Sequence, residues 1–227
     1  MVSTASLVCM GISAAFGFIL PVCALIYWRK TRKDVRWRPV IVGALTFLLF
    51  AIVLEPLLHS VCLVQDNPIS RAINGNPVLY MLYGGLAAGI FEETGRWLAF
   101  RFPLKKDLER DTAVSYGIGH GGIEAVLVLG VTMIANLVFV MAYQKSPLDA
   151  AAMVGGTDAA AQMAASLSGL TAGTLILGLF ERVLAMLLHI ALSIFVFVSV
   201  RDRRQRSYFP FAVALHAIAD MPAARPP

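Results

Sequence analysis

The sequence predicts an all-α fold, a polytopic bundle of about six transmembrane helices in a single integral membrane domain over residues 1–227. Hydrophobic residues make up 58% of the chain and charged residues only 15%, whereas soluble domains carry about 25% charged residues. Apolar runs of membrane-spanning length recur along the chain, and basic residues are concentrated in the short loops between them. The net charge of +5 therefore indicates membrane topology and not a nucleic-acid partner.

The expected spans follow from the apolar runs, taken in order. We place them at about residues 7–28, 39–64, 77–100, 112–143 and 167–200, each long enough to cross the hydrocarbon core. The segment from Gln144 to Ser166 is rich in small residues and is predicted to be a partly helical excursion between two spans. A sixth apolar segment begins at Tyr208 and is too short to span, so we expect it to be truncated or to end against other helices.

The loop charges predict the orientation. Residues 29–38 hold six Lys and Arg, residues 101–111 hold four and residues 201–206 hold four, while the intervening loops hold only Arg71 and Lys145. Basic loops remain on the cytoplasmic side, so we expect an N-terminus outside, in a bacterial cytoplasmic membrane. The first span precedes its basic residues, which is the reverse of a cleaved signal peptide.

The third span contains charged residues in the run Glu92-Glu93-Thr94-Gly95-Arg96. A charge at mid-bilayer depth costs at least ~2.5–3.5 kcal/mol on insertion scales, so such residues indicate a functional site. Glu92 and Arg96 are one helical turn apart and share a face, so the arginine can neutralise one carboxylate. Glu93 points about 100° away, which leaves a second carboxylate for general acid–base chemistry. The alternative is a buried ion pair that only fixes helix packing.

Histidines occur on three further apolar segments. His120 and Glu124 are four residues apart in the fourth span, His189 lies in the fifth, and His216 and Asp220 are four residues apart in the sixth segment. This spacing lets Asp220 accept a hydrogen bond from one imidazole nitrogen and so orient the ring.

Depth places these groups in one layer. At 1.5 Å per residue from the basic loops, Glu92 and Glu93 lie roughly 12–14 Å deep, His120 roughly 12 Å, His189 roughly 18 Å and His216 roughly 15 Å. We therefore predict that these side chains converge on one cavity nearer the cytoplasmic face. Because an unpaired guanidinium is costly at this depth, we also expect Arg96 to contact a carboxylate of its own motif or Glu124.

The fourth span also contains a glycine-rich string, Gly117-Ile118-Gly119-His120-Gly121-Gly122. Each glycine costs a helix about 1 kcal/mol relative to alanine, so we expect close helix approach to offset it. The string matches GxGxxG, but it lies inside an apolar helix with no preceding strand, which excludes a dinucleotide site. Glu55 and His59, near the outer end of the second span, are predicted to form an interfacial pair.

The motifs EETGR, GHGGIEA, ERVLAMLLH and HAIAD, in that order, resemble the YhfC family of intramembrane proteases, within the CAAX-protease and bacteriocin-processing superfamily. The resemblance covers about residues 77–220. It implies that Glu92 or Glu93 activates the hydrolytic water, that His120 is the middle histidine, and that His216 and Asp220 form the last motif. This chain departs from the superfamily pattern in its EExxR spacing, where EExxxR is usual. His189 adds an imidazole, so the middle histidine is His120 or His189.

The resemblance implies an endopeptidase that hydrolyses peptide bonds in or beside the bilayer, with a membrane-embedded or lipidated peptide or protein as substrate. One glutamate would take a proton from water and a histidine would donate to the oxyanion or the leaving amine. The superfamily favours a glutamate-type mechanism with no required cofactor. The alternative is a zinc site made by His120, His189 and His216.

Two other classes of function fit a layer of intramembrane Glu, His and Asp. A proton or divalent-cation transporter would use the same residues, although the inverted repeats typical of transporters are not evident here. A non-catalytic scaffold is the other, because the scaffold subunit of gamma-secretase resembles this superfamily.

Overall fold

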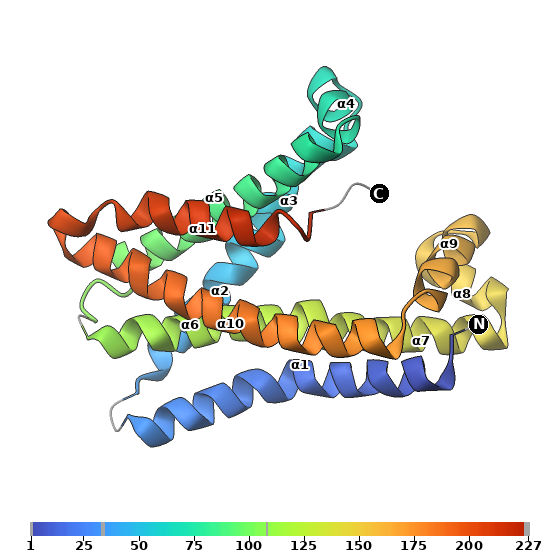
Figure 1. Ribbon diagram of the computed structural model, residues 1–227, viewed down its shortest axis with the longest axis horizontal. Helices are drawn as coiled ribbons and strands as arrows, with labels where there is room; N and C mark the ends of the chain where they lie inside the picture. Colours follow the sequence, from blue (N-terminus) through green and yellow to red (C-terminus); the bar gives the residue numbers. More distant parts are fainter. Residues whose placement is uncertain (1, 33–34, 108, 225–227) are drawn as a thin grey trace. The chain divides into compact units, whose positions relative to one another are not determined.

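The computed structural model describes residues 2–32, 35–107 and 109–224, in which every regular element is a helix (Figure 1). The predicted all-α fold is confirmed. The elements in chain order are α1 (Thr4–Thr31), α2 (Trp37–Phe47), η1 (Leu48–Leu54), α3 (Glu55–His59), η2 (Ser60–Val64), α4 (Pro68–Asn74), α5 (Pro77–Arg101), α6 (Arg110–Glu124), η3 (Ala125–Val131), α7 (Thr132–Lys145), α8 (Pro147–Val154), α9 (Thr157–Ser168), α10 (Ala172–Arg201), η4 (Arg203–Gln205) and α11 (Tyr208–Asp220).

Four continuous helical segments are long and apolar enough to cross a membrane: Thr4–Thr31, Trp37–Val64, Arg110–Lys145 and Ala172–Arg201. Two of them contain π-helical turns, since η1 and η2 interrupt the second segment and η3 interrupts the third. The predicted third span is also one helix, α5, and the sixth segment is the 13-residue helix α11. The chain is therefore an integral membrane protein.

The predicted start of the fifth span near Leu167 is wrong. Leu167 and Ser168 end α9, and α10 begins only at Ala172. The side-chain oxygen of Thr171 accepts the backbone N–H of Thr174, and that of Thr174 accepts the N–H of Thr171. This reciprocal capping fixes a new helix start inside what reads as one continuous apolar run.

The described chain forms two compact units, each described here by itself. The first unit comprises the chain up to Ala24 and Glu124–Ala185. Its core packs Met10, Phe139 and Leu167 together with neighbouring apolar side chains. The predicted excursion after the fourth span is the helix pair α8 and α9.

The second unit comprises Leu25–Ile123 and the chain from Met186 onwards. The aromatic rings of Phe100, Tyr116 and Phe197 form its core, with centroids 4.8 Å apart between Phe100 and Tyr116 and 5.3 Å apart between Phe100 and Phe197. All the candidate site residues except Glu124 belong to this unit.

Glycines bring the backbones of the second unit close together. A methyl group on Gly119 of α6 would lie 2.0 Å from the carbonyl oxygen of Val40 in α2, and one on Gly43 would lie 2.2 Å from that of Tyr116. Similarly, a methyl group on Gly85 of α5 would lie 2.4 Å from the carbonyl oxygen of Ala217, which explains how α5 and α11 lie side by side (Figure 1). The expected close helix approach at the glycine string is thus present at Gly119.

We expect Gly119→Ala to destabilise the protein by at least about 1–3 kcal/mol, because the added methyl group meets fixed backbone. The matched control is Gly178→Ala in α10, where an added methyl group meets nothing within 4 Å. It should be neutral or slightly stabilising, since alanine favours helix. Thermal unfolding in detergent measures both, and equal midpoints for the two variants would contradict the packing argument.

Candidate functional site

Four helices of the second unit place six polar side chains in one buried cluster. Glu92, Glu93 and Arg96 come from α5, His120 from α6, His189 from the C-terminal half of α10 and His216 from α11. The exposed fraction is 0% for Glu93, Arg96 and His120 and does not exceed 6% for any member. The structure therefore brings together the glutamate pair and the three histidines that the sequence analysis singled out.

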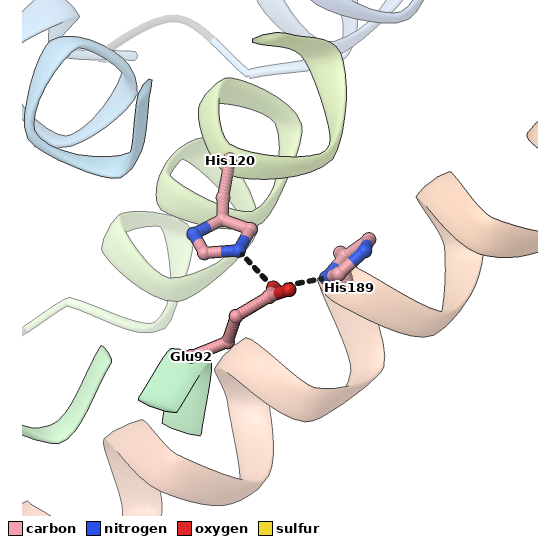
Figure 2. Close-up of side chains that lie close together, drawn as sticks. All are labelled: Glu92, His120 and His189. Carbon is pink, nitrogen blue, oxygen red and sulfur yellow. Dashed lines mark hydrogen bonds and ion pairs between the residues drawn. The ribbon is translucent and has the colours of Figure 1, made fainter. Parts of the chain in front are cut away.

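Glu92 lies between two imidazole rings (Figure 2). Its Oε2 atom is 2.8 Å from Nε2 of His120 and 4.0 Å from Nδ1 of His189. One possible ligand atom from each of the three residues lies within 4.8 Å of the other two. Among the described residues, no other group of three or more His, Cys, Asp or Glu side chains has donor atoms close enough to share one metal ion.

Glu93 faces a different set of partners. Its Oε1 atom accepts hydrogen bonds from Nη1 of Arg96 at 2.5 Å and from Nδ1 of His216 at 2.7 Å. The second terminal nitrogen of Arg96 is 3.1 Å from Nδ1 of His189. A guanidinium group only donates, so Nδ1 of His189 accepts this bond and carries no proton.

His216 is held at both ring nitrogens. Nδ1 donates to Glu93, while Nε2 lies 3.3 Å from Oδ2 of Asp220 and 3.9 Å from Oε2 of Glu92. The predicted contact between His216 and Asp220 is therefore present. Because Glu93 fixes the tautomer, Nε2 is the nitrogen that can take up or release a proton beside Glu92.

The prediction that Arg96 contacts a carboxylate of its own motif is confirmed, but the partner is Glu93 and not Glu92, which the four-residue spacing also allowed. The structure pairs Arg96 with Glu93, three residues away, and turns Glu92 toward His120. Both three- and four-residue spacings bring side chains together on a helix, so spacing alone did not decide between the glutamates.

Glu124 has another partner. Its Oε1 atom accepts a hydrogen bond of 2.6 Å from Nη1 of Arg182 in the first unit, and Arg182 also pairs with Glu181. The predicted pair of Glu55 and His59 is present, with Nε2 of His59 3.2 Å from Oε1 of Glu55.

Two aromatic residues near these groups were not predicted. The hydroxyl of Tyr83 lies 2.8 Å from Nδ1 of His59. The buried ring of Tyr116 stacks on His120 with centroids 5.8 Å apart, and the guanidinium of Arg96 lies 6.0 Å from its centroid. Tyr116 is one helical turn before His120, and that spacing is the signal that could have identified it.

We expect Arg96→Met to destabilise the protein by about 3–5 kcal/mol, because the buried Glu93 carboxylate loses its fixed counter-charge. The double variant Glu93→Gln/Arg96→Met should recover part of this loss, since neither charge remains. The control is Arg71→Met, which breaks the exposed pair with Asp66 and should cost no more than about 1 kcal/mol. A single variant as stable as the control, measured by thermal unfolding, would refute the role of the ion pair.

Comparisons with known proteins agree with the predicted resemblance. The family described as YhfC intramembrane metalloprotease matches residues 16–225 of the chain. The chain is 34% identical over 224 residues to the Bacillus subtilis (strain 168) protein named "Uncharacterized membrane protein YhfC", covering 98% of this chain and 86% of that protein. No solved structure matches. The family description and the group of Glu92, His120 and His189 favour a metal over the expectation that no cofactor is required. The group differs from the expected set of His120, His189 and His216, because it contains Glu92 in place of His216. The chain belongs to the YhfC intramembrane metalloprotease family.

Proposed function

We propose that this protein is a zinc-dependent intramembrane endopeptidase whose metal is held by Glu92, His120 and His189. The observation that carries the proposal is the convergence of these three donor atoms, buried on three separate helices, within 4.8 Å of one another. Two histidines and a glutamate are a known ligand set of catalytic zinc, and such sites keep a further position open.

Metal binding would change the hydrogen bonds of both histidines. Nδ1 of His189 carries no proton and lies 4.0 Å from Oε2 of Glu92, but its one lone pair accepts a hydrogen bond from Arg96, and that bond would have to break before Nδ1 could bind zinc. His120 donates from Nε2 to the Glu92 carboxylate, and that proton would be released when a cation binds. Zinc bound there would supply a Lewis acid that polarises the scissile carbonyl and lowers the pKa of water.

His216 is proposed to move the proton during hydrolysis. Its Nε2 atom lies 3.9 Å from Glu92, and its Nδ1–H is held by Glu93. The Glu93 carboxylate stabilises the imidazolium that forms when Nε2 takes a proton, and the protonated ring can then donate to the leaving amine. Asp220, 3.3 Å from Nε2, steers the ring and accepts from it when it is charged.

The runner-up mechanism uses the same residues without metal. In it, Glu92 is the general base, His120 orients it, and His216 donates to the oxyanion. Both mechanisms require Glu92 and His216, so they differ in their response to a chelator and not in their dependence on these residues.

The proposed substrate is a peptide bond within or beside the bilayer, in a membrane-embedded or lipidated peptide or protein. The proposed location is the bacterial cytoplasmic membrane with the N-terminus outside and the cluster nearer the cytoplasmic face. The fourteen Lys and Arg in residues 29–38, 101–111 and 201–206 support this orientation, since basic loops remain inside.

We expect the purified protein to carry about one zinc ion per chain, measured by elemental analysis after exposure to zinc and removal of the excess. His120→Ala and His189→Ala should abolish this binding, because each removes one of three ligands. His59→Ala is the matched control, since His59 pairs with Glu55 and lies outside the cluster. Stoichiometric zinc in both ligand variants, or none in the wild type, would refute the metal site.

We expect Glu92→Gln to reduce cleavage of transmembrane peptides by at least about 10²-fold with a folded yield near that of the wild type, because a neutral amide is a poor zinc ligand and cannot act as the general base of the runner-up mechanism. The cleavage activity of His216→Ala should fall by a similar factor while the variant keeps its zinc. The activity of Asp220→Asn should fall less, because Asp220 acts only by orienting the imidazole ring of His216. A chelator should abolish cleavage by the wild type and zinc should restore it. Full activity in chelator would favour the metal-free mechanism, while full activity of Glu92→Gln would contradict both.

A further inference from the structure

A second polar feature of the second unit is a basic cavity of about 740 Å³. It lies at the C-terminal ends of α5 and α10 and at the start of α11. Its lining includes Trp97, Arg101, Arg201, Arg203, Arg206 and Phe209. None of these residues belongs to the cluster of glutamates and histidines.

The arginines of this cavity make no ion pair in the described part of the chain, although the Asp107 carboxylate acts on Arg201 from a greater distance. No described carboxylate oxygen lies within 4.0 Å of a side-chain nitrogen of Arg101, Arg201, Arg203 or Arg206. The terminal nitrogens of Arg201 donate to three backbone carbonyls, those of Leu104, Lys105 and Asp107. Carbonyl groups satisfy hydrogen bonds without cancelling the charge, so the cavity attracts anions.

The surroundings of the cavity favour a lipid headgroup over a soluble anion as its ligand. Arg201 is the last residue of the membrane-spanning helix α10, which places the arginines where lipid headgroups lie. Trp97 and Phe209 provide apolar surface beside them, and tryptophan is typical of the membrane–water interface. Thr94, Trp97 and Arg101 form a stripe on one face of α5 along which a ligand can contact both kinds of surface.

We propose that this cavity binds a phosphate group, and that its source is the headgroup of an anionic phospholipid. Arginine pairs with phosphate through two parallel hydrogen bonds, which gives geometric selectivity as well as charge. Basic pockets at the membrane surface recognise anionic headgroups in this way.

The test uses the full chain in detergent with Trp28→Phe and Trp37→Phe, so that Trp97 is the remaining one of the three tryptophans. Its fluorescence is followed during titration with short-chain phosphatidylglycerol, with short-chain phosphatidylcholine and with inorganic phosphate. We expect saturable binding of phosphatidylglycerol, weakened at least about tenfold by Arg203→Gln/Arg206→Gln. The matched control, Lys106→Gln/Arg110→Gln, removes the same charge from residues that do not line the cavity and should shift the affinity less than about twofold.

The outcomes separate the possible ligands. Inorganic phosphate that binds as tightly and displaces the lipid would support the phosphate site but overturn the lipid as its source. Equal binding of phosphatidylcholine, or equal weakening by the two double variants, would overturn the proposal. So would a phosphate-free polyglutamate peptide that binds as tightly and with the same dependence on Arg203 and Arg206, because the cavity would then be a site for acidic peptides.

Discussion

The buried charge of Arg96 is the constraint on which the geometry of the candidate site depends. Its guanidinium has no exposed surface, so in a membrane-spanning fold it must be neutralised and hydrogen-bonded within the protein. One terminal nitrogen binds Glu93 on the same helix and the other binds His189 on α10. Glu93 in turn holds His216 on α11. A single cation thus sets the side-chain conformations of residues on three helices, and it leaves Glu92 to face His120.

Close backbone packing makes this arrangement possible. A methyl group on Gly117 of α6 would lie 2.6 Å from the Cα atom of Ile190, and one on Gly121 would lie 3.2 Å from Cβ of His189. Because α6 and α10 approach so closely, the rings of His120 and His189 have centroids only 5.0 Å apart. The glycines that weaken α6 as an isolated helix therefore bring two imidazoles within reach of one carboxylate. The glycine-rich run of α6 thus costs helix stability, and it allows the close approach of α6 and α10 that forms the site.

The sequence was sufficient for the fold class and for most helix bounds, because both follow from apolar runs and their flanking charges. It was also sufficient to nominate the clustered residues, since polar groups at one depth on several spans are costly unless they meet. It did not decide which glutamate binds Arg96, because three- and four-residue spacings both allow contact. It also did not reveal the π-helical turns of η1, η2 and η3, which depend on backbone hydrogen bonding and have no residue pattern of their own. The break before Ala172 was missed because Thr171 and Thr174 form a local capping pair inside an apolar run.

The balance of charge in the cluster connects its stability to its chemistry. Among the six described side chains of the cluster, Glu92 and Glu93 are negative and Arg96 is the permanent cation, so these side chains carry one net negative charge when the histidines are neutral. A net charge in a medium of low dielectric constant is unfavourable, and a proton on an imidazole or a bound cation would offset it. Asp220, whose Oδ2 atom lies 3.3 Å from Nε2 of His216, is a further carboxylate and cannot supply the positive charge. In the proposed mechanism, this net charge would favour both cation binding next to Glu92 and proton uptake at His216. A fold that had to bury only a neutral ion pair would need neither the second glutamate nor three histidines around it.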